Sequence, residues 1–253
     1  MVNHPLNLLL ASALTFTVTV PQAIATGFDD LSSNVTPEET LVSLKFPQAG
    51  DRGTTQSSGG GGTRGGSCFT QANTNLRIVA PGQDTFTATA TPSLFVYVPA
   101  NRGVEGEFVL VDGDGALIHE QAVTVPEGET ILAIAVPTDI ALEPGGEYAW
   151  AFAVNCTIDN QVVGSAVEAG LVRQELSVEI TEQIEETNEP LAKASLYANQ
   201  GIWQDTLMIV ASLPEQRDEL VELFDSVGLG QFSDVPIIFV GTDEASGDPS
   251  TAN

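Results

Sequence analysis

Large and small apolar residues alternate along Glu147–Cys156, which reads EYAWAFAVNC. Tyr148, Trp150, Phe152 and Val154 occupy every second position, and alanines stand between them. A period of two places successive side chains on opposite faces, so this pattern predicts a β-strand. No charged residue interrupts the alternation. We therefore expect a central strand that is covered on both faces, by an aromatic layer on one side and a close layer on the alanine side.

Further short apolar runs surround this strand and are separated by turn-forming residues. The other expected strands are Leu76–Val79, Leu94–Val98, Glu107–Val111, Leu117–Val125, Ile131–Val136 and Val162–Arg173. Asp112–Gly115 reads DGDG, which tolerates positive φ and predicts a tight hairpin; a calcium loop is the less favoured alternative. Short strands at this spacing predict an antiparallel β-sandwich over residues 68–173, immunoglobulin-like in general architecture.

The hydrophobic period becomes helical after Arg173. The expected apolar stripes are Leu176, Ile180 and Ile184; Trp203, Leu207, Val210 and Ala211; and Leu220, Leu223, Phe224 and Val227. Asn188 is the expected N-cap of a helix that begins near Pro190, and Gly228 is the expected C-cap of the last helix. The whole is an α+β fold in which residues 174–236 form a helical hairpin or short bundle. Such short helices need burial against one another or against the sandwich.

Both ends of the chain are expected to lie outside this core. The apolar run Leu6–Val20 and the small residues of Ala23–Ala25 predict a signal peptide over residues 1–25, with a retained anchor helix as the alternative. Cleavage near Ala25 would leave a secreted or periplasmic protein with no membrane span. Residues 26–67 read as a flexible lead-in with a glycine-rich loop and one short apolar run, Leu41–Phe46, that could form an edge strand. Residues 237–253 read as a disordered tail.

Charge and cysteine content restrict the function. The chain has 34 acidic and 8 basic residues and a formal charge of −26, which disfavours nucleic acid as a partner. Cys68 and Cys156 are the two cysteines, and in an exported protein they predict a disulfide. A zinc site or reactive thiol has less support, because His119 is the single histidine that remains once the signal peptide is removed.

No catalytic constellation stands out, so the sequence predicts no catalytic, cofactor or metal site. His119 lies beside Glu120 in an expected strand, and no GxSxG motif accompanies a serine. Carboxylates are so numerous that the sequence selects no pair for glycoside hydrolysis.

Several segments together resemble a known family. They are Asp51–Gly53, Gly62–Gly65, Phe95–Pro99, Glu107–Leu110, Gly146 through Cys156, Gly170–Arg173, Leu196–Ala198, Gly201–Asp205 and Ser226–Leu229. The chain resembles the cyanobacterial exported family of domain of unknown function 928. Gln204 departs from the tyrosine that the family often has there. The resemblance implies an exported bacterial protein and brings no established activity.

The helical region also looks like part of a single tetratricopeptide helix pair, which cannot bury its own apolar face. The expected interaction surface comprises Tyr197, Trp203, Asp205 and Leu229. The leading hypothesis is a non-catalytic module that binds a protein partner through the helices or an open sheet edge, in the periplasm or envelope. The alternatives are a carbohydrate- or cell-envelope-binding sandwich and a hydrolase with paired carboxylates.

Overall fold

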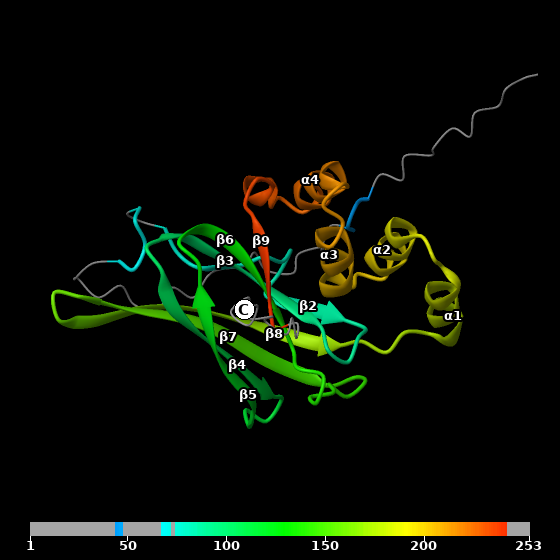
Figure 1. Cartoon of the computed structure of the whole chain (residues 1–253). Coiled ribbons are helices and arrows are strands. Elements are labelled where there is room, and N and C mark those ends of the chain that lie inside the picture. Colours follow the sequence, from blue (N-terminus) through cyan, green and yellow to red (C-terminus); the bar gives the residue numbers. More distant parts are fainter. Residues whose placement is uncertain (1–43, 48–66, 72–73, 242–253) are drawn as a thin grey trace, which may run out of the picture. The chain divides into compact units, whose positions relative to one another are not determined.

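A computed structural model describes residues 44–47, 67–71 and 74–241 of the chain (Figure 1). In these segments, eight strands precede four helices, a short 3-10 helix and a last strand. The strands are β1 (Arg77–Ile78), β2 (Asp84–Thr87), β3 (Ser93–Asn101), β4 (Val104–Asp112), β5 (Leu117–Val125), β6 (Gly128–Ala135), β7 (Glu147–Ile158), β8 (Gln161–Arg173) and β9 (Ile237–Val240). The helices are α1 (Val178–Glu186), α2 (Pro190–Asn199), α3 (Trp203–Ala211), α4 (Arg217–Ser226) and the 3-10 turn η1 (Gly230–Phe232).

The strands form two sheets, with the orders β1-β3-β6-β9 and β2-β8-β7-β4-β5. All seven strands expected from the sequence are present, and β2 and β9 are additional. The prediction of a purely antiparallel arrangement is wrong, because β2 runs parallel to β8 and β9 runs parallel to β6. Both pairs join strands that are far apart in the sequence, and long connections permit parallel pairing. The immunoglobulin-like topology stays a prediction.

Strand β7 is central in its sheet, as expected, between β4 and β8. The rings of Trp150 and Phe152 are buried, and their cross-strand neighbours on β4 are Leu110 and Phe108. The prediction that β7 is covered on both faces is wrong. The alanines that alternate with its large residues are exposed or half-buried. Methyl groups tolerate partial contact with water, so the absence of charge on a strand face does not require a second covering layer.

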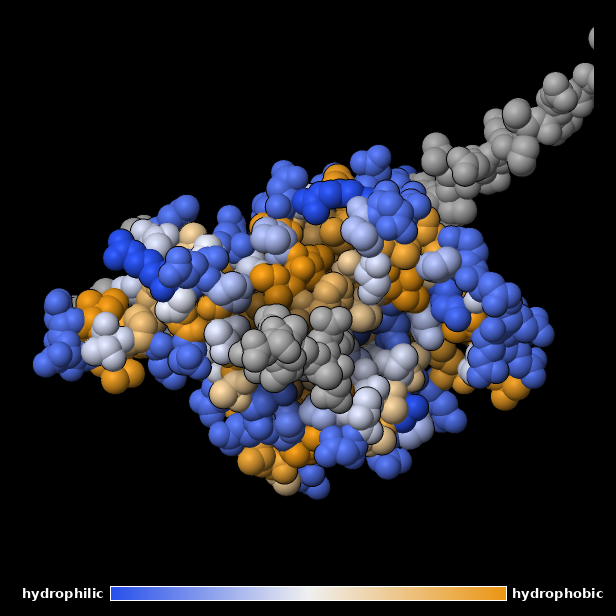
Figure 2. All heavy atoms as spheres, in the orientation of Figure 1, coloured by the Kyte–Doolittle hydropathy of each residue, from blue (hydrophilic) through white to orange (hydrophobic). Residues whose placement is uncertain are grey.

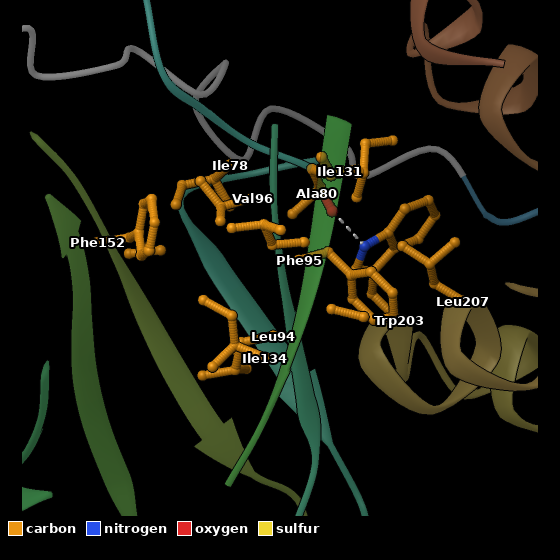
Figure 3. Packing of buried hydrophobic residues seen from close by; sticks show 14 of the residues in the cluster. Ile78, Ala80, Leu94, Phe95, Val96, Ile131, Ile134, Phe152, Trp203 and Leu207 are labelled. Carbon is orange, nitrogen blue, oxygen red and sulfur yellow. Dashed lines mark hydrogen bonds between the residues drawn. The ribbon is translucent and has the colours of Figure 1, made fainter. Parts of the chain in front are cut away.

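Both sheets and the helices contribute side chains to one hydrophobic core, which gives the sheets a sandwich-like arrangement. Leu94 and Val96 on β3 lie toward Phe152 of the other sheet (Figure 3). The side chain of Phe95 points to the opposite face of the same strand, and Figure 3 shows it on the side of Trp203 in α3. The sheet that contains β3 therefore has buried side chains on both of its faces.

The predicted disulfide is confirmed. Cys68 and Cys156 are bonded across a sequence separation of 88 residues, with their Cα atoms 5.6 Å apart. The bond joins the segment before β1 to the end of β7. This cross-link is typical of proteins that fold in an oxidising compartment.

The expected helical stripes are confirmed in part, because Leu176 precedes α1 and its N-cap Ser177, and Val227 is the C-cap of α4. One of the expected caps is wrong. Glu189, not Asn188, is the N-cap of α2: its side chain accepts a hydrogen bond from the backbone of Ala192, and Pro190 begins the helix. Gly228 follows α4 with φ of +75°, the left-handed conformation that ends many helices. The disordered tail expected over residues 237–253 is wrong at its start, because Ile237–Val240 form β9.

The signal peptide, most of the lead-in and glycine-rich loop, and residues 242–253 lie outside the described residues. Within the lead-in, residues 44–47 are described and form no strand. Leu44 and Phe46 are nevertheless buried, and the Phe46 ring packs edge-on against Trp203 with 5.0 Å between ring centroids. Across the described segments, no helix combines the length and apolar character needed to cross a membrane.

Candidate functional site

A cavity of about 810 Å³ lies where α2 and α3 meet the ends of several strands. Its walls come from the loop between β2 and β3, from β5, from the end of β6 and the loop after it, and from both helices. The lining residues include Thr89, Thr91, Ser93, Gln121, Val136, Asp139, Lys193, Tyr197, Gln204, Asp205, Met208 and Ile209. This volume lies within the range of about 300–1,000 Å³ that small-molecule sites occupy.

Asp205 is the most buried carboxylate of the cavity and lies in the first turn of α3. Its Oδ2 accepts hydrogen bonds from the Thr87 hydroxyl at 2.7 Å and the Ala88 backbone N–H at 3.0 Å. The residue is only 6% exposed, and burial raises the pKa of its carboxyl despite these hydrogen bonds. The second oxygen, Oδ1, is buried and has no hydrogen-bond partner.

Gln204 contributes a second free acceptor beside Asp205. Its Nε2 donates to the Thr85 hydroxyl at 3.0 Å, and that hydroxyl donates its own hydrogen to the Gly170 carbonyl. Thr85 can therefore only accept from Gln204, which fixes the orientation of the amide. The Gln204 Oε1 atom is left buried without a partner.

Gln121 lines the cavity from β5, the strand at the end of the five-stranded sheet. Its Oε1 is 3.2 Å from His119 Nε2, and its Nε2 is buried without a partner. Among the described residues, six side-chain atoms are buried and unpartnered, and three of them belong to residues that line this one cavity. Buried polar atoms ordinarily find partners, so the wall of this cavity departs from the usual pattern at three residues.

Helix α2 adds a cation and a phenol to the cavity. Lys193 and Tyr197 are four residues apart and thus lie on the same helix face. Burial raises the pKa of the Tyr197 hydroxyl, and the nearby negative charge of Asp205 raises it further. The phenol therefore stays protonated and can donate a hydrogen bond.

The structure divides the four residues of the expected interaction surface between two environments. Tyr197 and Asp205 line the cavity, whereas Trp203 and Leu229 lie in the core with 1% and 5% of their surface exposed. The four residues therefore do not form one continuous surface.

Trp203, Gln204 and Asp205 instead attach α3 to the sheets through three consecutive side chains. The Trp203 Nε1 donates to the Val79 carbonyl at 2.8 Å, while Gln204 and Asp205 bond to the segment that contains β2. The GIWQD segment thus holds the helix in place, and its residues Gln204 and Asp205 also line the cavity.

Sequence reasoning did not select Gln121, Lys193 or Gln204 as site residues. No distinctive local signal exists for Gln204, which stands beside Asp205 and Thr206 in the polar part of the first helical turn. No local signal exists for Gln121, whose strand pattern resembles that of any half-exposed strand.

The carboxylates of Asp139 and Asp205 both line the cavity, and the pKa of Asp205 is raised. The hydrolase hypothesis requires two carboxylates at a defined separation in one cleft, with the pKa of one of them raised, and the raised pKa of Asp205 meets the second condition. Asp139 is exposed to solvent whereas Asp205 is buried, so their environments differ.

These features define an α+β protein with a cavity where two helices meet strands of both sheets. The chain belongs to the family described as Domain of Unknown Function (DUF928), whose model matches residues 59–237. No curated protein matches the chain.

One solved structure with a weak likeness is a glycosyl hydrolase family 2 member from Bacteroides cellulosilyticus DSM 14838. The two chains are 12% identical, the match covers 60% of this chain and 29% of the other, and the TM-score is 0.20. A likeness this low supports no statement about the fold or the activity.

Proposed function

We propose that this protein is a non-catalytic binding module of the periplasm or cell envelope and that its cavity holds a small polar ligand. The observation that carries the proposal is a cavity of about 810 Å³ whose walls combine apolar side chains with Gln121, Gln204 and Asp205, each of which has a buried atom without a hydrogen-bond partner. Sites for small molecules commonly combine apolar walls with a few placed polar groups in this way. The disulfide supports the expected location outside the cytoplasm.

The test is a thermal-shift titration of the full chain with sugars, polyols, amino acids and polyamines. We expect at least one of these classes to raise the melting temperature in a concentration-dependent way. Met208 lines the cavity and is half-buried, so Met208→Trp should fill the space and abolish the shift. Val178→Trp is the matched control, because Val178 is 74% exposed on α1. If no class shifts the wild type, the proposal is refuted.

The paired carboxylates support a hydrolase as an alternative to simple binding. The distinguishing measurement is the fate of a bound compound after long incubation with excess protein. Recovery of the intact compound supports the binding module. Cleavage that Asp205→Asn and Asp139→Asn both abolish would support the hydrolase instead.

A protein partner at the open edge of β9 is a second candidate function. Strand β9 ends its sheet, and Ile238 and Phe239 on it are 37% and 36% exposed. Figure 2 shows apolar residues near β9 with hydrophilic residues around them. An exposed edge with apolar side chains is the kind of surface that an extended segment of another protein can extend by strand pairing.

This candidate predicts that a partner captured from the native envelope protects the β9 amides from hydrogen exchange. Phe239→Lys should abolish both capture and protection. Leu117→Lys should leave them unchanged, because Leu117 is equally apolar and 59% exposed on β5. Capture that Phe239→Lys does not affect would refute the candidate.

A further inference from the structure

A short segment of the lead-in, residues 44–47, packs against α3 and α4, where Figure 1 shows it in blue. Leu44 and Phe46 are only 1% and 7% exposed, whereas Lys45 and Pro47 are exposed to solvent. This alternation is typical of an extended chain that has one face against a surface. The segment forms no helix or strand, so its side chains hold it in place.

The helices present a preformed acceptor and an aromatic surface to this segment. The Phe46 ring packs edge-on against Trp203 at the start of α3, with 5.0 Å between ring centroids. The Phe46 backbone N–H donates to Ser226 Oγ at the end of α4, at 3.1 Å. The Ser226 hydroxyl donates its own hydrogen to the Leu223 carbonyl at 2.7 Å, so it can only accept from Phe46. Peptide recognition commonly combines such backbone hydrogen bonds with contacts to selected side chains.

Charge complements these contacts. A hollow of about 650 Å³ beside the segment is lined by Lys45, Phe46 and residues of α4. The residues of α4 are Asp218, Val221, Glu222, Asp225 and Ser226. Three of them are acidic and share one helix face with Val221, and Lys45 is the basic residue of this lining. The surface of α4 therefore favours a segment in which a basic residue stands between two apolar ones.

The segment lies outside the part of the chain that the family model matches. That part begins at residue 59, and it contains α3 and α4 in full. A single helix pair cannot bury its own apolar face, and here residues 44–47 cover the face around Trp203. The occupant of this surface thus comes from outside the matched domain, which is what separable binding requires.

We propose that Trp203, Ser226 and the acidic face of α4 form a recognition site for a peptide segment of the pattern apolar–basic–apolar, which residues 44–46 occupy as a detachable ligand within the same chain. The site is separate from the cavity and from β9, and the inference depends on neither. A tethered segment has a high local concentration at its site, so it excludes a free segment of the same pattern while it is bound.

The test is digestion of the full chain with a lysine-specific protease, because Lys45 and Lys193 are the two lysines of the sequence. Cleavage at Lys45 measures release of the segment, whereas cleavage at Lys193 in α2 measures opening of the helical region. We expect Phe46→Ala to accelerate cleavage at Lys45 by roughly tenfold or more, because an aromatic anchor is lost, and to leave the rate at Lys193 unchanged.

Phe69→Ala is the matched control, because Phe69 is also 7% exposed and lies outside the segment. It should not favour cleavage at Lys45 over cleavage at Lys193. Equal acceleration at both lysines in Phe46→Ala would show that the segment is an inseparable part of the core, and the proposal would fall. Wild-type protection of Lys45 that is lost on dilution would show that a second copy supplies the segment, which contradicts an occupant from the same chain.

A second measurement tests recognition of a free segment, with a fluorescent peptide of residues 42–49 as the probe. By fluorescence anisotropy, we expect the peptide to bind the full-chain variant Leu44→Ala/Phe46→Ala roughly tenfold or more tightly than the wild type, whose site is occupied. Peptides that carry Lys45→Glu or Phe46→Ala should bind this variant more weakly than the unaltered peptide does. Equal affinity for the variant and the wild type, equal affinity of the three peptides, or no binding at all would overturn the proposal.

Discussion

The indole nitrogen of Trp203 donates a buried hydrogen bond of 2.8 Å to the backbone oxygen of Val79, 124 residues earlier in the chain. Phe46 packs edge-on against the same indole, so α3, the end of β1 and the lead-in meet at one side chain (Figure 3 shows the Trp203 hydrogen bond). A residue expected on an interaction surface therefore holds the helical region against the sheet.

Replacing Trp203 should reveal this hydrogen bond. We expect Trp203→Phe to lower the free energy of unfolding by about 1–3 kcal/mol more than Trp150→Phe does. Trp150 is the matched control, because it is equally buried and its Nε1 has no partner. The measurement is urea denaturation followed by circular dichroism. Equal losses in the two variants would contradict a stabilising role for the Val79 hydrogen bond.

The disulfide should contribute strongly to stability. Closing a loop between residues 88 apart restricts the unfolded chain by roughly 4–5 kcal/mol in the chain-entropy account. We expect a reductant to lower the melting temperature of the wild type markedly. The double variant Cys68→Ala/Cys156→Ala should start lower and show no response to the reductant. If the reductant leaves the melting temperature of the wild type unchanged, the prediction is contradicted.

Burial of Asp205 predicts a specific pH dependence. Its pKa is raised in the folded state, so between the unfolded and folded pKa values the folded protein binds more protons. The contribution of Asp205 to stability is therefore most favourable at acid pH and falls as pH rises through the folded pKa. We expect the melting temperature of the wild type, relative to that of Asp205→Asn, to fall from about pH 4 upward.

The comparison with Asp205→Asn removes the effect of the many other carboxylates, which titrate in both proteins. Glu185→Gln, which removes a carboxylate at an exposed position of α1, is the control. A melting-temperature difference for Asp205→Asn that rises with pH would have the wrong sign and contradict the assignment.

Gly106 allows close packing between neighbouring strands. A Cβ added there would lie 2.5 Å from Cζ and 2.8 Å from Cε2 of the Phe152 ring. We expect Gly106→Ala to destabilise the protein by about 1–3 kcal/mol, because the core ring must move. Combined with Phe152→Leu, the glycine change should cost less than it does alone. Strict additivity of the two changes in urea denaturation would contradict a direct clash.

Local patterns account for much of the fold. The alternation around Trp150 and the turn residues between the other runs were sufficient to predict seven strands, because period and turn chemistry depend on neighbours in sequence. Strand β2 was missed because Asp84–Thr87, read DTFT, is short and polar. Strand β9 was missed because its four apolar residues precede a polar end that suggested disorder. Pairing with distant strands stabilises both.

The site was less accessible to prediction. Tyr197 and Asp205 were selected as part of a surface, but the sequence could not indicate that Asp205 is buried beneath the β2 segment. Gln121 carries no local signal, since its importance comes from proximity to α3.

The sequence alone was sufficient to predict the helical and extended periods and the family, because both depend on local residue patterns. It was also sufficient to predict the pairing of the two cysteines, because two cysteines allow a single disulfide. The parallel pairings, the attachment of α3 and the cavity depended on tertiary contacts. Those contacts join residues more than a hundred positions apart, and their energies depend on burial and on unpartnered polar atoms that exist only once the chain has folded.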